Sequence, residues 1–260
     1  MLRDYVLFRI GILIFLFNSS VDAGRRVRPR HKTTNFDYFL LAQSWLPQLC
    51  HMEGFPIGCA AEERYENNSL VIHGMWPGLH RPWPHLARCH SDAFDPTRAL
   101  DGVKRQKLRR AWPNIGETRM SPDYADFWGY QWMKHGTCTE LSQQQYMRAT
   151  LQLHRQVIRR WPKRLETSVA RSTLLTALEA GVKGSVALGC DDTLSLLYVY
   201  TCWERRRNER QLPGRRRPCP VHVHRPPACG ATIRLRSFDV DAGDGAATAT
   251  ATNSARMYDD

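Results

Sequence analysis

Two short segments hold most of the side chains that could do chemistry. Residues 71–77 read Val-Ile-His-Gly-Met-Trp-Pro, and residues 127–138 read Phe-Trp-Gly-Tyr-Gln-Trp-Met-Lys-His-Gly-Thr-Cys. They supply two imidazoles, His73 and His135, together with the ammonium of Lys134 and several aromatic rings. An imidazole can both take and give a proton near neutral pH, so two of them can act as base and acid in one displacement. This set of groups is suited to RNA cleavage.

The first segment is predicted to lie on a strand. Residues 70–73 are a short apolar run, and Pro77 is expected to close the strand. The two-residue period places Val71 and His73 on one face, and Leu70 and Ile72 on the other. His73 can therefore project from a rigid element.

The second segment is predicted to lie on a helix. Ser121 is suited to the N-cap, Pro122 to the first helical position, and Gly136 to the end. On such a helix Gln131 precedes Lys134 by three residues and His135 by four, which places the three side chains along one cleft. Trp128 and Trp132, four apart on the same helix, can anchor it in the core or wall the pocket, and the first is the commoner role of large aromatic side chains.

The rest of the chain mixes strands and helices. The apolar runs at residues 36–45, 194–203 and 232–238 are typical of strands. Residues 95–112 and 142–161 show helical spacing with basic, solvated faces, and residues 165–180 indicate a third helix. Long helices combined with non-alternating strands favour an α+β domain.

The two ends of the chain differ in character from its middle. Residues 1–23 are typical of a signal peptide, with a basic start, an apolar run at 10–17 and a small-residue cleavage site ending at Ala23. Residues 24–35 form a basic N-terminal segment, residues 36–238 a catalytic domain, and residues 239–260 a low-complexity tail that we expect to be disordered. The apolar run is too short to span a membrane. We therefore expect a monomer exported through the secretory pathway, secreted or vacuolar, and free of the membrane after cleavage.

The net charge indicates which partners the protein can attract, and the cysteine content indicates its cellular compartment. The formal net charge is +12, and such a surplus attracts polyanions without implying that they are cleaved. The eight cysteines behind a signal peptide indicate four disulfides in an oxidising compartment, although spacing alone does not decide the pairs. Cys219 and Cys229, with His222 and His224 between them, also allow a zinc site. We favour disulfides, and expect no metal and no other cofactor.

These residues resemble those of a known family. His-Gly-Met-Trp-Pro at 73–77 is similar to the first active-site segment of the ribonuclease T2 family, and Trp-Met-Lys-His-Gly-Thr-Cys at 132–138 to the second. The likeness to the plant branch, which includes the S-ribonucleases, continues through the aromatic run after residue 36, residues 197–202 and the last cysteines. Nearly all of residues 36–238 is covered, with both motifs in the expected order.

The resemblance implies a fold and a pattern of disulfides. The family has an α+β domain in which an antiparallel sheet is packed with helices. Its disulfide pattern would tie the region after the first motif to the end of the catalytic helix. The implied pairs are Cys50 with Cys59, Cys89 with Cys138, Cys190 with Cys229, and Cys202 with Cys219.

The resemblance also implies a reaction. The family cleaves single-stranded RNA without a metal: the ribose 2′-hydroxyl attacks the adjacent phosphorus, the 5′-oxygen leaves, and a 2′,3′-cyclic phosphate results. Matched by position, His135 is the base, His73 the acid, and Lys134 offsets charge on the phosphorane. Trp76 matches a position that stacks on a base.

The chain departs from the family pattern at three positions. Gln131 stands where the family usually has Glu, and an amide brings no negative charge to hold Lys134 or tune His135. Tyr130 stands where many members have a third histidine, and Gly78 where an acidic residue often helps to read a base. We predict a slowed endoribonuclease whose base preference cannot be taken from its relatives.

Three alternatives stay open at this level. The protein could be a ribonuclease-like binder of RNA or protein with little turnover, in defence, storage or pollen recognition. The six arginines at 205–207 and 215–217 could be a solvated hairpin tip or a phosphate-tracking patch. Asn67 begins an Asn-Asn-Ser sequon, which permits N-glycosylation.

Overall fold

The computed structural model describes residues 35–52, 59, 69–81, 86–115, 125–162, 166–206, 212–224 and 228–238, and all of them belong to one unit of the chain. The expected signal peptide, basic segment and tail lie outside these residues, as do the Asn67 sequon and the helix start at Ser121 and Pro122. In the described ranges no helix has the length and hydrophobicity that a membrane span requires.

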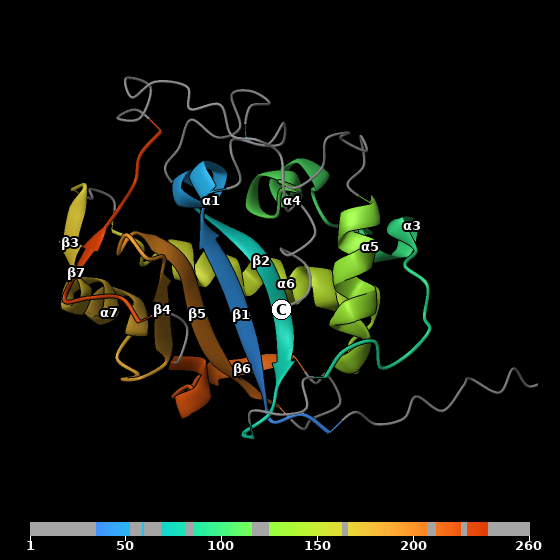
Figure 1. Ribbon diagram of the computed structural model, residues 1–260. Helices are drawn as coiled ribbons and strands as arrows, with labels where there is room; N and C mark the ends of the chain where they lie inside the picture. The colour runs from blue at the N-terminus through green and yellow to red at the C-terminus, as the bar shows by residue number, and fades with distance from the viewer. Residues whose placement is uncertain are drawn as a thin grey trace, which may run out of the picture. The chain divides into compact units, whose positions relative to one another are not determined.

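The centre of the fold is an antiparallel sheet with the strand order β2-β1-β5-β4, and β6 pairs with the end of β5 that extends past β4, on the side away from β1 (Figure 1). A separate pair, β3 and β7, is also antiparallel. The strand bounds are β1 Tyr38–Trp45, β2 Leu70–Gly78, β3 Ser168–Ala170, β4 Val186–Cys190, β5 Leu196–Arg205, β6 Pro213–Arg216 and β7 Thr232–Arg234.

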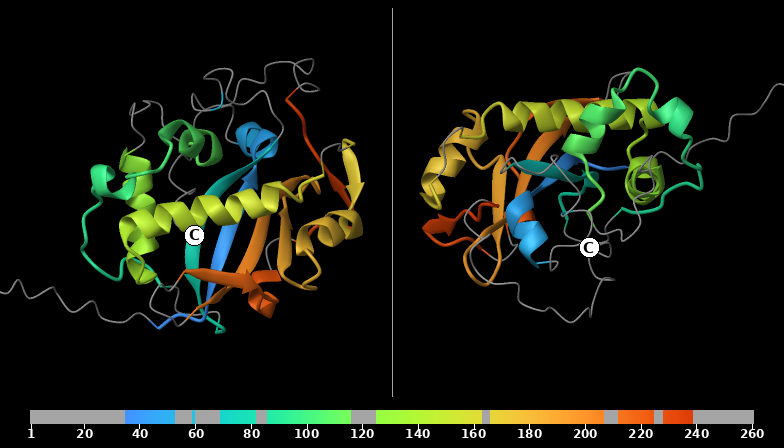
Figure 2. Two further views of the ribbon diagram at one scale, coloured as in Figure 1. Left: turned by 180° about the vertical axis from the view of Figure 1, so that it is seen from behind. Right: turned by 90° about the horizontal axis from the view of Figure 1, so that it is seen from above.

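Helices lie across one face of this sheet and along its β2 edge (Figures 1 and 2). The longest, α6, crosses the sheet, and its buried side chains share one core with the large apolar residues of β1, Phe39, Leu41 and Trp45. Helix α5 stands beside β2. The helix bounds are α1 Leu46–Met52, α3 Pro96–Ala99, α4 Arg105–Ala111, α5 Ala125–Lys134, α6 Gln143–Ile158 and α7 Arg171–Glu179, with short 3-10 helices η1 Gly136–Cys138 and η2 Val221–His224.

The predicted fold class, an α+β domain with an antiparallel sheet and four disulfides, is confirmed. Strands β1 and β5 and helix α6 lie close to where their apolar patterns place them. Helix α6 begins with a capping box in which Ser142 and Gln145 satisfy each other's backbone N–H groups, the arrangement that most firmly marks a helix start.

Two predicted elements in the first half of the chain have different bounds. Residues 95–112 form two short helices, α3 and α4, because Gly102 lies between them with φ of +64° and cannot continue a helix. Strand β2 does not close at Pro77 but continues to Gly78. It is an edge strand of the sheet, where a missing N–H donor is tolerated.

The C-terminal elements are shorter than their apolar runs. Helix α7 covers only residues 171–179 of the predicted 165–180, because residues 168–170 pair with β7, and Ala180 ends the helix with φ of +57°. Strand β7 itself ends at Arg234. Helix α1 and strands β4 and β6 were not predicted.

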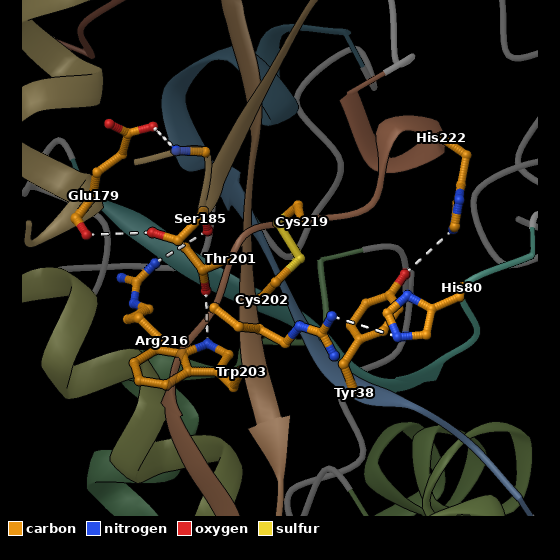
Figure 3. Close-up of a disulfide and its surroundings, with 12 residues drawn as sticks. Tyr38, His80, Glu179, Ser185, Thr201, Cys202, Trp203, Arg216, Cys219 and His222 are labelled. Carbon is orange, nitrogen blue, oxygen red and sulfur yellow. Dashed lines mark hydrogen bonds between the residues drawn. A yellow bond between two sulfur atoms is a disulfide. The ribbon is translucent and has the colours of Figure 1, made fainter. Parts of the chain in front are cut away.

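All eight cysteines of the chain are in disulfides, and none is free. The pairs are those that the resemblance implies: Cys50–Cys59, Cys89–Cys138, Cys190–Cys229 and Cys202–Cys219. The Cys202–Cys219 bond joins β5 to the segment that follows β6 (Figure 3). Cys219 and Cys229 are therefore not available as thiolate ligands for zinc.

The packing of α6 on β1 makes stability depend on pH through His154. This imidazole is 8% exposed and its Nδ1 lies 2.9 Å from Gln43 Nε2 on β1. Burial, with a smaller effect of the Arg155 charge, lowers its pKa from 6.5 to about 4. Because the unfolded chain then binds the proton more readily, this contribution to stability is complete above pH 6.5 and is lost as the pH falls toward 4.

We therefore expect acidification from pH 7.5 to pH 5 to cost about 2 kcal/mol of unfolding free energy through His154 alone. Urea unfolding of the wild type and of His154→Gln at both pH values measures this difference. The exposed His51, changed to Gln, is the matched control and should keep the wild-type dependence. An unchanged pH dependence in His154→Gln would contradict the prediction.

Candidate active site

A bulge in β2 brings His73 and Trp76 to the sheet face opposite α6. The pairs Ala42–Gly74 and Gln43–Ile72 follow one another on β1, so His73 is one extra residue on β2. Bulges re-aim side chains and are frequent beside functional sites. Trp112 stabilises this backbone, because its Nε1 donates to the His73 carbonyl at 3.1 Å.

The bulge changes which residues share a face. Leu70 and Ile72 point into the core under α6 while Val71 packs in a second cluster, as the two-residue period predicts. Beyond the extra residue, Met75 belongs to the α6 core, which leaves Trp76 on the open face. His73 and Trp76, three residues apart, consequently lie on the same side.

The end of α5 brings the second imidazole to this place. Helix α5 ends at Lys134, and His135 follows it directly before η1. A side chain at Gly136 would collide with the Trp132 ring, so this tight turn needs glycine. The Cys89–Cys138 disulfide and the bond from Arg88 N–H to the Lys134 carbonyl at 2.9 Å tie the segment after β2 to this turn.

His73 and His135 both lie against one indole. The ring centroid of Trp76 is 5.4 Å from that of His73, edge-on, and 5.2 Å from that of His135, tilted by 30°. The two imidazoles therefore cannot be farther apart than the sum of these distances. His73 and Trp76 are half-buried, and His135 is 7% exposed. The structure thus brings together the three residues that the two motifs contribute.

Gln131 reaches the same place from α5. Its side chain is 2% exposed, and its Oε1 lies 2.7 Å from the position that a Cβ on Gly74 would occupy. That position would also collide with Trp76 Nε1, so glycine is required where α5 meets β2. Among the described residues, neither Gln131 Oε1 nor Trp76 Nε1 has a hydrogen-bond partner. An acceptor and a donor are thus both buried and unsatisfied at the floor of the site.

Lys134 lies at the outer end of α5 in a small cationic group. Its Nζ is 5.5 Å from the centroid of the Tyr130 ring, and the guanidinium carbon of Arg88 is 5.8 Å from the same centroid. Arg88 is exposed and sits in the left-handed region with φ of +50°. Two cations that contact one aromatic ring, one of them next to His135 in the sequence, suit the binding of an anion.

Tyr198 and Tyr200 extend the aromatic surface across the sheet, and sequence reasoning missed them. The Tyr198 centroid is 5.9 Å from that of His73, and the Tyr200 centroid is 6.4 Å from that of Trp76. The strand β1 between them carries only small side chains here, Ala42 and Ser44, so the rings meet over it. Their two-residue spacing on a predicted strand was the available signal.

Other aromatic positions in the motifs have structural roles. Trp128 and Trp132 are 0% and 3% exposed, and their indole nitrogens donate to the carbonyls of Trp112 and Asp92. They pack the core, as sequence reasoning favoured. At Gly78, a side chain would collide with the ring of Tyr38, whose pKa burial raises to about 12. The glycine at this position is thus required by packing.

No group of three or more His, Cys, Asp or Glu residues capable of holding a metal ion occurs within the described part of the chain. What the site does offer is proton transfer by two imidazoles, positive charge from Lys134 and Arg88, and half-buried aromatic faces. Phosphate esters of nucleosides, whose bases are aromatic, are the substrates that this combination fits best.

The fold and site define a class: a disulfide-rich α+β protein with two imidazoles against one indole. Residues 36–211 match the model of the Ribonuclease T2 family. The chain belongs to this family.

Curated proteins agree with this assignment, and solved structures agree with the fold. Ribonuclease S-4 of Pyrus pyrifolia is 26% identical over 129 residues, which are 50% of this chain and 46% of that protein. Ribonuclease 1 of Arabidopsis thaliana is 26% identical over 217 residues, 78% of this chain and 88% of its own. A crystal structure of RNase NT in complex with 5′-AMP matches 78% of this chain and all of its own, with a TM-score of 0.59 and 22% identity. The chain spans about half the length of several of the curated relatives that it matches.

Proposed function

We propose that this protein is an endoribonuclease that cleaves single-stranded RNA by transphosphorylation without a metal. His135 takes the proton of the ribose 2′-hydroxyl, the 2′-oxygen bonds to phosphorus, and the bond to the 5′-oxygen breaks as His73 gives that oxygen a proton. The products are a 2′,3′-cyclic phosphate and a free 5′-hydroxyl. DNA lacks the attacking hydroxyl and is not a substrate.

One observation carries this proposal: His73 and His135, which come from separate elements, both lie against the Trp76 ring. General acid and base must reach opposite oxygens of one phosphate, and separate elements that converge on one indole permit this. Family membership supports the same chemistry. Lys134 stabilises the charge that grows on the phosphorane, and Trp76, Tyr198 and Tyr200 offer faces on which bases stack.

The proposal is tested with a short RNA of defined sequence, incubated with the purified protein in the presence and absence of a chelator. We expect unchanged cleavage with the chelator, a 2′,3′-cyclic phosphate on the 5′ fragment, and no cleavage of the DNA of the same sequence. Stoichiometric retention of intact RNA would instead favour the alternative, a ribonuclease-like binding protein. Gln131, in place of the family's Glu, is the residue that favours this alternative.

We expect Gln131→Glu to raise the rate of RNA cleavage by roughly 3- to 10-fold, which corresponds to about 1 kcal/mol of transition-state stabilisation. A carboxylate here supplies negative charge to hold Lys134 and to favour protonated His135 during proton transfer, which the amide cannot do. It also offers an ionised acceptor beside Trp76 Nε1, which has no partner among the described residues.

The matched control is Gln131→Met, which keeps the side-chain length without either charge or hydrogen bond and should be slower than wild type. Initial rates on a dinucleotide at several pH values make the comparison. A Glu variant no faster than wild type throughout this range would contradict the charge argument.

We further propose that the protein is exported through the secretory pathway and works outside the cell or in the vacuole. With every cysteine in a disulfide, the fold depends on an oxidising compartment. Expression with and without residues 1–23, followed by a search of the medium and the cell extract, tests this location.

A further inference from the structure

A cavity of about 500 Å³ opens between α6, β5, β6 and the turn after α7. It lies on the α6 side of the sheet, because Trp203, one of its walls, belongs to the α6 core. Tyr198 and Tyr200 on the same strand belong to the opposite face. The cavity is therefore separate from the candidate active site.

Arginine dominates the charge of this cavity. Its lining includes Arg160, Arg206, Arg215 and Arg216, and the amides of Gln152 and Gln156. Among the described residues that line it there is no carboxylate. Glu204 lies nearby on β5, where it accepts from the backbone N–H of Arg215 at 3.4 Å, but it is not part of the lining. Four cations thus share one hollow without an acidic partner in its described wall.

Arg216 is fixed inside this hollow. Its guanidinium carbon lies 4.3 Å from the centroid of the Trp203 ring, and Nη1 donates to the Ser185 carbonyl at 3.5 Å (Figure 3). Its Nη2 is buried and has no hydrogen-bond partner in the described part of the chain. Burial, and then the charge of Arg160, lower its pKa from 12.5 to about 10, so the group is still charged at neutral pH. A charged donor is thus held against Trp203 with one of its nitrogens, Nη2, unsatisfied.

An anion with several oxygens would satisfy this arrangement. The planar guanidinium matches phosphate in two-pronged geometry, and a bound anion would offset the repulsion between Arg160 and Arg216. The cavity is also large enough for more than the phosphate itself. We propose that it is a phosphate-binding site, distinct from the candidate active site.

A second cationic hollow lies beside the first, across α6. It measures about 360 Å³ and is lined by Lys107 and Arg110 of α4 and by Arg155 and Arg159 at the end of α6. The two hollows share the C-terminal half of α6 as a common wall. A nucleic-acid strand could place phosphates in both, so the test includes a strand as well as an isolated phosphate compound.

The test follows indole N–H signals by NMR while pyrophosphate is added to the full chain. Trp203 reports the cavity, and Trp76 reports the candidate active site. We expect a saturable shift of Trp203 whose midpoint differs from that of Trp76. The double variant Arg206→Gln/Arg215→Gln, which changes two exposed side chains, should weaken the Trp203 response at least tenfold. Arg98→Gln, an equally exposed arginine on α3, is the matched control and should not.

A single-stranded DNA oligonucleotide, which lacks the 2′-hydroxyl, distinguishes the sources of phosphate. If a strand is the ligand, the 5′-hydroxyl oligonucleotide shifts Trp203 as a 5′-phosphorylated one does. If a terminal phosphate is required, only the phosphorylated one does. The proposal is overturned if Trp203 does not respond to pyrophosphate, if it moves only in step with Trp76, or if the double variant binds as wild type.

Cleavage of a dinucleotide keeps this test independent of the proposed function. The double variant should cleave it at the wild-type rate, because neither arginine belongs to the candidate active site. Loss of that activity in the double variant would contradict the separation of the two sites. Absence of cleavage by the wild type would count against the proposed function alone and would leave the binding result unchanged.

Discussion

Replacing His135 by alanine is expected to lower kcat for RNA cleavage by roughly 10²- to 10⁴-fold, the usual contribution of a positioned general base. His73→Ala should have a similar effect through the loss of the acid. Single-turnover assays on a short RNA measure the chemical step directly. Binding of a DNA oligonucleotide should change little, since Trp76 and the tyrosines remain.

The two histidines should also fail to act independently. If they serve one displacement, the double variant should be hardly slower than the slower single variant. His51→Ala, at an exposed position on α1, controls for the loss of an imidazole as such. Rates within tenfold of wild type in either single variant would remove that residue from the mechanism.

Local sequence signals accounted for the parts of the fold that depend on local contacts. Helix α6 was predicted because its apolar period lies within the helix itself. Strand β6 was not, since a Pro-Gly-Arg-Arg segment pairs as a strand only against β5, with Arg216 stacked on Trp203. The pairing is a tertiary contact, and no pattern within the segment indicates it.

Some residues of the candidate site could likewise be predicted from the sequence, and others could not. The motifs identified His73, His135 and Trp76 without any knowledge of their positions in space. Tyr198 and Tyr200 were not predicted as site residues, because the register of β5 on β1 determines which face of the sheet they occupy. The predicted end of β2 was wrong because Pro77 was expected to end the strand. Since β2 is at the edge of the sheet, the missing N–H donor of Pro77 does not disrupt its pairing.

The six arginines at 205–207 and 215–217 show that sequence patterns also fail to predict the tertiary contacts of charged residues. Arg205 bonds to Glu140 at 2.7 Å and stacks on Phe36, with its guanidinium carbon 4.1 Å from the ring centroid. Arg216 stacks on Trp203. The hypothesis of a solvated hairpin tip is therefore wrong for at least Arg205 and Arg216. Partners distant in the sequence decide which cations are structural and which are available to a ligand.

Removing the Cys89–Cys138 disulfide by changing both residues to alanine is expected to lower the unfolding free energy by about 4 kcal/mol, because the bond closes a loop with a sequence separation of 49. It should also lower kcat in the folded protein. Cys138 lies three residues after His135, and the bond holds the turn that aims this imidazole at Trp76.

The control for this variant is the Cys50–Cys59 pair, changed in the same way. Its sequence separation is 9, so the same chain-entropy argument gives a smaller loss, about 2.5 kcal/mol. Neither cysteine lies in the segments that carry His73 or His135, so kcat should stay at the wild-type value. Urea unfolding and dinucleotide cleavage, measured on both variants below their unfolding transitions, separate the two effects. If both variants lost activity equally, the disulfide at η1 would matter to the fold as a whole and not to the position of His135.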